Sequence, residues 1–152
     1  MNATRKHNQF TAEEIEAALV NPFKVGDGAT LCMYSDRQAY TVIKVTAQSV
    51  TLQRDKATLL NGHNSGEPDA LTFTPGGFVG HTEGIQRYKY EADPKGEIIV
   101  ARMKRKPRRV SLPCGEWVEN ERGLFTERLA PWFKHKSSTV VPGRSEHYDF
   151  NF

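Results

Sequence analysis

The feature that most constrains the fold is a series of short strand-forming stretches separated by turn-forming residues. Residues 29–33, 40–46 and 50–53 are rich in β-branched and aromatic side chains and alternate in part between apolar and polar. Further candidates follow at 71–74, 86–91, 97–103, 109–112, 116–119 and 147–152. Short strands joined by tight turns are typical of antiparallel sheets. The sequence therefore predicts a mainly β, α+β fold, a small antiparallel β-barrel or sandwich.

One helix is predicted before these strands, over residues of about 11–20. Thr11 followed by Glu14 is a capping box, in which each side chain accepts a hydrogen bond from the backbone of the other residue. Apolar residues then recur at helical spacing. Pro22 ends the pattern, because the residue before a proline is driven out of the α region.

The predicted strands are interrupted by residues 60–84, which are rich in Gly, Asn and Pro and predict a long loop with at most one short strand. Loops of this length in small domains are usually functional or disordered. The 152 residues are expected to form a single domain, 1–152. No apolar run approaches the roughly 20 residues of a membrane helix, and residues 1–9 have no signal-peptide core, so we expect a cytoplasmic protein.

Catalytic and metal-binding motifs are not found in the sequence. There is no GxSxG motif, and Cys32 and Cys114 lie far apart without a CxxC motif or a neighbouring histidine pair. The five histidines lack HxH and HExxH spacing. A site formed by His63, His81 and an acidic residue of the long loop remains an alternative to polar loop histidines. We expect no enzyme activity, no metal and no cofactor.

A candidate binding motif separates two of the predicted strands. Tyr34, Ser35, Asp36 and Arg37 offer a ring face, a hydroxyl, a carboxylate and a guanidinium, which together suit a base and a phosphate-ribose unit. The alternative is a turn whose Ser and Asp bond their own backbone. Arg54 is a second candidate, for which a surface ion pair with Asp55 is the alternative.

Two further segments carry aromatic and charged side chains that suit a nucleotide. Phe78 lies among glycines, where it would stack on a base or else anchor a crossover in the core. Arg144, Tyr148 and Asp149 belong to an unusually aromatic stretch near residue 152, which we expect to dock as a closing strand or across a pocket.

A basic run is the clearest feature for nucleic-acid binding. Its six positive charges exceed the net charge of +3 of the whole chain, so the rest of the chain is slightly acidic. The run comprises Arg102, Lys104, Arg105, Lys106, Arg108 and Arg109. Clustered Lys and Arg neutralise phosphates, but a solvated strand edge has the same composition, and no aromatic residue interleaves with the run.

The segments VGDGATLCMYSDRQAYTVIKV, QRDKATLL, PGGFVGHTEG and GRSEHYDFNF, taken in this order, resemble a family of small phage-encoded proteins related to the phage anti-Thoeris sponge proteins. The resemblance covers about a third of the chain. It implies a mainly β protein, a homodimer or larger homo-oligomer, that acts in the cytoplasm of a bacterial host cell. Such sponges bind a cyclic ADP-ribose isomer and sequester this immune signal without cleaving it.

The positions that the resemblance assigns to ligand binding are those of the YSDR motif and Arg144, Tyr148 and Asp149, whereas Arg54 and Phe78 are inferred from chemistry alone. Residues 60–84 exceed what the compact sponges have, which leaves the boundary of the pocket open. The alternative function is a nucleic-acid-binding or protein-blocking SH3-like β-barrel module, with the basic run as its binding surface.

Overall fold

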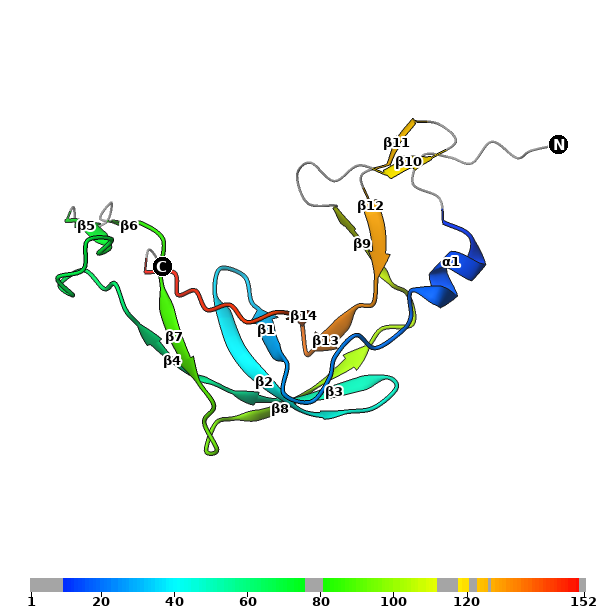
Figure 1. The fold of residues 1–152 in the computed structure, drawn as a ribbon, viewed down its shortest axis with the longest axis horizontal. Helices are drawn as coiled ribbons and strands as arrows, with labels where there is room; N and C mark the ends of the chain where they lie inside the picture. Colours follow the sequence, from blue (N-terminus) through cyan, green and yellow to red (C-terminus); the bar gives the residue numbers. More distant parts are fainter. Residues whose placement is uncertain (1–9, 76–80, 112–117, 121–122, 126, 151–152) are drawn as a thin grey trace.

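The computed structural model describes residues 10–75, 81–111, 118–120, 123–125 and 127–150, and its centre is a closed six-stranded antiparallel barrel (Figure 1). Around the barrel the strands follow the order β1 (Gly28–Cys32), β14 (Ser138–Pro142), β13 (Phe133–His135), β8 (Ile98–Met103), β3 (Ser49–Arg54) and β2 (Arg37–Val45). The predicted mainly β fold with one N-terminal helix is confirmed. β1, β2, β3 and β8 lie where strands were predicted, within a few residues at each end.

The core is filled by the inward-facing residues of these strands. Leu52, Val50 and Ala101 are fully buried, and the alternation along β8 leaves Ile98 and Val100 exposed on the outside. Phe23, from the segment that precedes β1, packs edge-on against Phe133 with the ring centroids 5.2 Å apart. Buried rings of this size contribute a large share of the hydrophobic stabilisation of a small core.

The helix α1 (Ala12–Ala17) begins at the predicted capping box, with the amide of Glu14 3.1 Å from Thr11 Oγ1 and the amide of Thr11 2.7 Å from Glu14 Oε2. It is shorter than the predicted 11–20 and has no buried residue. Four residues after it, the side-chain amide of Asn21 donates to the carbonyls of Thr46 and Ser49. These bonds hold the chain extended against the β2–β3 hairpin, so the helix ends early.

Residues 60–84, predicted to form a loop, instead belong to a ribbon of paired strands. β4 (Lys56–Leu59) pairs with β7 (Tyr88–Glu91), and β5 (Thr72–Thr74) pairs with β6 (His81–Glu83) near the tip. The prediction of at most one strand here is wrong. Asn61 is fully buried, and its side chain bonds the carbonyls of Asp69 and Ile85 and the amide of Arg87. This one side chain thus connects the two halves of the ribbon where their backbones are not paired as strands.

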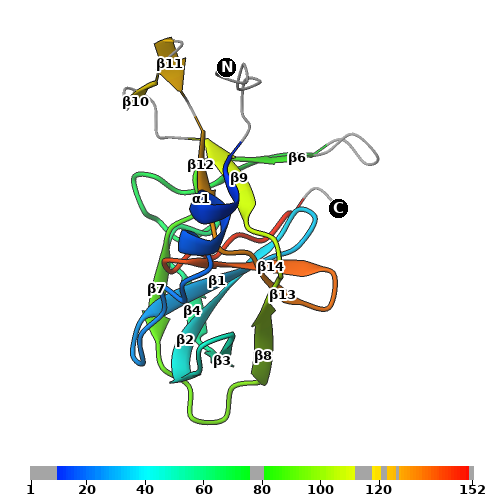
Figure 2. The same cartoon turned by 90° about the vertical axis from the view of Figure 1, so that its right-hand side faces the viewer.

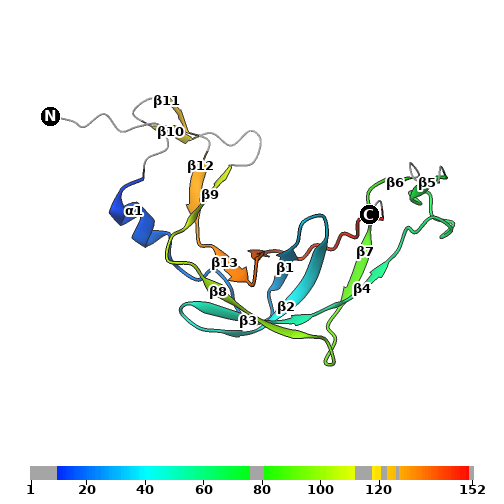
Figure 3. The same ribbon diagram turned by 180° about the vertical axis from the view of Figure 1, so that it is seen from behind.

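A second ribbon extends from the other end of the barrel. β9 (Arg108–Ser111) pairs with β12 (Glu127–Ala130), and β10 (Val118–Asn120) pairs with β11 (Gly123–Phe125). The two strands predicted at 109–112 and 116–119 therefore do not pair with each other where the structure describes them, and residues 112–117 between them lie outside the described residues. Figures 1 and 3 show the two ribbons rising on the same side of the barrel, and Figures 1 and 2 show α1 beside β9 and β12.

The last predicted strand, 147–152, is also wrong within the residues that the structure describes. Residues 143–150 run across the barrel towards β7, and the one strand pairing recorded for them is an isolated bridge between His147 and Arg37 of β2 (Figure 1). None of the described helices has the length and apolar character needed to cross a membrane.

Candidate functional site

The YSDR turn and the segment 144–150, here called the tail, lie side by side. The turn is closed by the amide of Met33, which donates to the carbonyl of Asp36 at 2.9 Å. Arg37 and His147 exchange two backbone hydrogen bonds of 2.9 and 3.0 Å, and the amide of Asp149 donates to Asp36 Oδ1 at 2.8 Å. Two segments that are more than a hundred residues apart in the sequence thus form one surface, as the binding hypothesis requires.

The two arginines predicted to bind a pyrophosphate already bind carboxylates of the protein. Arg54 pairs through both terminal nitrogens with Glu146 and donates to the carbonyl of Ala39 at 2.9 Å. Arg144 Nε lies 2.6 Å from Asp55 Oδ2, and its Nη2 lies 2.9 Å from Thr41 Oγ1. An anion at either guanidinium would have to displace a carboxylate.

These ion pairs hold the tail against the barrel. Asp55 is only 4% exposed, so its charge is stabilised by Arg144 and the Thr41 hydroxyl rather than by water. Gly28 allows the arginine to lie this close, since a Cβ atom there would come within 2.8 Å of the Arg144 Cβ. Burial, followed by the negative charge of Glu146, raises the pKa of Tyr88 on the neighbouring ribbon.

The remaining predicted residues of this site differ in how they are held. Tyr34 is exposed at the tip of the turn, and Ser35 and Asp36 are half-buried. Tyr148 packs against Phe150 at a centroid distance of 4.8 Å, and its backbone amide donates to Gln86. Phe78 lies outside the described residues.

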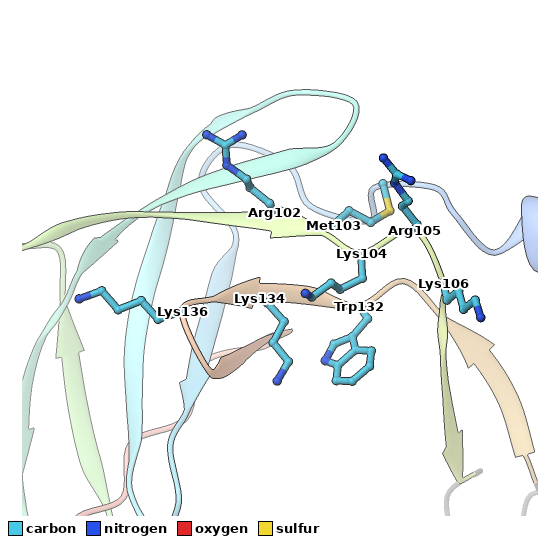
Figure 4. Close-up of a pocket in the computed structure, with 8 residues that line it drawn as sticks. All are labelled: Arg102, Met103, Lys104, Arg105, Lys106, Trp132, Lys134 and Lys136. Atoms are coloured by element: carbon cyan, nitrogen blue, oxygen red, sulfur yellow. The ribbon is translucent and has the colours of Figure 1, made fainter.

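A separate cavity of about 890 Å³, here called the basic cavity, lies at the C-terminal end of β8 (Figure 4). It is lined by Arg102, Met103, Lys104, Arg105, Lys106, Trp132, Lys134 and Lys136. Six of these eight residues are cationic and none is acidic. Four of the six belong to the basic run identified in the sequence.

The barrel brings the lining together from two segments. β8 and β13 pair with Arg102 opposite Lys134, and the amide of Lys104 donates to the carbonyl of Trp132 at 2.7 Å. The Lys134 ammonium lies 4.9 Å from the centroid of the Trp132 ring, a cation–π contact. Trp132 therefore supplies the aromatic ring that the basic run itself lacks.

The other two arginines of the run, Arg108 and Arg109, do not line the basic cavity. They are successive residues of β9, and successive residues of a strand point to opposite faces, so their surroundings differ. Arg109 lies over the ring of Phe10, 5.6 Å from its centroid. Arg108 lines another cavity, of about 600 Å³, here called the Tyr34 cavity. Its lining comprises Cys32, Met33, Tyr34, Arg108, Ser137, Ser138, Thr139 and Val141.

Sequence reasoning missed Trp132, Lys134 and Lys136. The signal was present in the segment WFKHK at 132–136, in which a tryptophan is followed at alternate positions by two lysines, so that all three side chains share one face of a strand. Only the barrel register shows that this segment faces the basic run.

No group of three or more His, Cys, Asp or Glu side chains is placed to bind a metal ion in the part of the chain that the structure describes, and the side chain of His81, which the candidate metal site requires, lies outside that part. His63 instead bonds the carbonyl of Leu71 at 3.1 Å and packs edge-on against Phe73. Comparisons with family models, curated proteins and solved structures found no match for this chain, so its function has to be argued from the geometry.

Proposed function

We propose that this protein binds nucleic acid through the basic cavity. The observation that carries the proposal is the convergence of six Lys and Arg side chains around one tryptophan, from segments 102–106 and 132–136. Clustered cations release the counterions of phosphates on binding, and an aromatic ring adds stacking with bases.

The cations of the basic cavity lie close together without acidic partners, unlike four cations elsewhere in the described chain, and this supports a role in binding. Arg54, Arg87, Lys89 and Arg144 each form an ion pair with an acidic side chain. None of the six cations of the basic cavity forms an ion pair with a residue that the structure describes. Like charges this close repel one another, and a polyanion would relieve that repulsion.

Binding is tested by fluorescence anisotropy with a labelled single-stranded oligonucleotide at increasing salt. We expect the affinity to fall steeply between about 50 and 200 mM salt. The double variant Lys104→Ala/Lys106→Ala is expected to weaken binding about tenfold and to reduce the salt slope by about 2, because two phosphate contacts are lost.

The matched control is Lys56→Ala/Lys95→Ala, which removes the same charge from exposed positions outside the cavity. Lack of binding at about 50 mM salt, or equal weakening in the two double variants, contradicts the proposal.

A second candidate is the phage anti-defence sponge that sequesters a cyclic ADP-ribose isomer as a homodimer or larger homo-oligomer. What supports it is the junction of the YSDR turn with the tail beside the Tyr34 cavity, whose volume suits a small ligand. The pairing of Arg54 and Arg144 with internal carboxylates weighs against it. In the binding experiment a cyclic ADP-ribose isomer is therefore the small-molecule arm, and tight binding of it without binding of oligonucleotides favours this candidate.

A further inference from the structure

The strand register of the barrel joins the basic cavity to the Tyr34 cavity by a row of side chains on one face. Arg102 of β8 lies opposite Lys134 of β13, and Lys134 lies opposite Thr139 of β14. Thr139 lies opposite Cys32 of β1, and Cys32 lies opposite Arg37 of β2. Residues directly opposite in antiparallel strands share a face of the sheet.

This row crosses five strands, which at about 4.8 Å between neighbours is about 19 Å of surface. The burial pattern places this row on the outside of the barrel. Three of its members are next in sequence to residues that are buried in the core, namely Ala101, Phe133 and Val140, and successive residues of a strand point to opposite faces. Cations stand at both ends of the row, and the small side chains of Thr139 and Cys32 lie between them.

The two cavities also meet at a direct contact. Trp132 lines the basic cavity, and its indole Nε1 donates to Oγ1 of Thr139, which lines the Tyr34 cavity, at 3.2 Å. Arg108 lines the second cavity two residues after Lys106 of the first. The basic surface therefore continues across β13 and β14 and ends at the YSDR turn.

We infer that the bound nucleic acid is a single strand that crosses the barrel along this row, from the basic cavity to the Tyr34 cavity. The inference rests on the proposed function and adds to it the class of nucleic acid and the path. Trp132 lies in the basic cavity where this meets the Tyr34 cavity, and Tyr34 lies near the far end of the path, so both can offer ring faces to unpaired bases. The bases of a duplex are already stacked on one another, and a duplex of this length is too stiff to follow the curved barrel.

The test compares oligothymidylates of about 2, 8 and 16 nucleotides with a duplex of the longest length, in low salt. We expect affinity to rise with length until both cavities are spanned and to remain constant beyond that, with the duplex binding more weakly than its single strand. Tyr34→Ala is expected to weaken the longest oligonucleotide at least about fivefold, because one stacked base is lost, and to leave the shortest unchanged.

Phe73→Ala is the control, since Phe73 is also an exposed aromatic residue but belongs to the β5–β6 tip outside both cavities. Equal affinity for duplex and single strand, or no effect of Tyr34→Ala at any length, overturns the single-strand path while leaving binding at the basic cavity intact. No binding of any oligonucleotide overturns the proposed function itself.

Discussion

The carboxylate of Asp55 shows why Arg144, predicted from the sequence to bind a ligand, instead has a structural role. It is almost completely buried, and its oxygens are taken by Arg144 and Thr41. Arg54, the residue before it, points to Glu146, two residues beyond Arg144 in the tail. Each segment thus supplies one acid and one arginine, and the two ion pairs lock the tail to the end of β3.

The buried ion pair predicts the effect of removing Arg144. Arg144→Ala leaves the charge of Asp55 buried without its cation, so we expect the free energy of unfolding to fall by about 3–5 kcal/mol. Urea denaturation measures this change. The double variant Arg144→Ala/Asp55→Asn is expected to recover part of the loss, because the uncompensated charge is gone.

Arg87→Ala is the matched control for this prediction. Arg87 pairs with Asp69 and Glu67 on the surface of a ribbon, where water screens the charges and a salt bridge contributes little to stability. If Arg144→Ala costs no more than Arg87→Ala, the ion pair with Asp55 does not hold the tail.

Tyr40 predicts how stability depends on alkaline pH. Burial, reinforced by the negative charge of Glu97 and opposed by the charge of Arg54, raises the pKa of the Tyr40 phenol above its ordinary value of 10.0. Between these two pKa values only the unfolded chain has lost the proton, so the free energy of unfolding falls as the pH rises above about 10. Tyr40→Phe is expected to flatten this fall, as measured by denaturant midpoints at pH values on both sides of 10; an unchanged slope contradicts the assignment.

At the scale of elements, the ribbon formed by β4 to β7 depends on a single buried amide. The side chain of Asn61 bonds three backbone groups of the ribbon, and the backbone carbonyl of Asn61 accepts from the amide of Leu71 at 2.8 Å. No residue from 61–87 other than Leu71 belongs to the buried apolar residues of the described chain. Polar contacts therefore order this ribbon more than hydrophobic burial does.

Asn61→Ala is therefore expected to loosen the ribbon while the barrel stays folded. Each lost hydrogen bond leaves a partly buried backbone group without its partner, at a cost of about 1 kcal/mol, and the ribbon has little else to compensate. Hydrogen exchange of the Leu71 and Arg87 amides is expected to accelerate, with the amides of β1 and β3 unchanged. Ser65→Ala, an exposed change in the same ribbon, is the control; equal acceleration throughout the barrel contradicts a local role.

The elements that the sequence predicts correctly are those defined by local signals. The capping box fixes the start of α1, and the strand-forming stretches at 40–46 and 50–53 coincide with the paired strands β2 and β3. The pairing of β9 with β12 was not predictable, because the β10–β11 hairpin lies between them in the sequence and hairpin reasoning joins nearest neighbours. The sequence also does not predict that Asn61 orders the ribbon, because this role depends on the position of its side-chain amide in the folded ribbon.

At the scale of the whole molecule, the candidate sites follow from barrel closure. The sequence identified the YSDR motif, the tail and the basic run, and the structure joins the first two directly. It did not show that Lys134 and Trp132 would face the basic run, since β13 reaches β8 only through the barrel register. Long-range register is set by how the core packs, and no local pattern in the chain reports it.

The pairing of β1 with β14 has a consequence for how the chain reaches this structure during synthesis. β1 leaves the ribosome early, but its partner at 138–142 emerges roughly a hundred residues later, a wait of the order of ten seconds. A nascent or prematurely terminated polypeptide that stops before residue 138 exposes one edge of β1, with unpaired donors and acceptors beside Leu31 and Ala29. Such an edge recruits other strands, so we expect truncated translation products to aggregate rather than to accumulate as partly folded barrels.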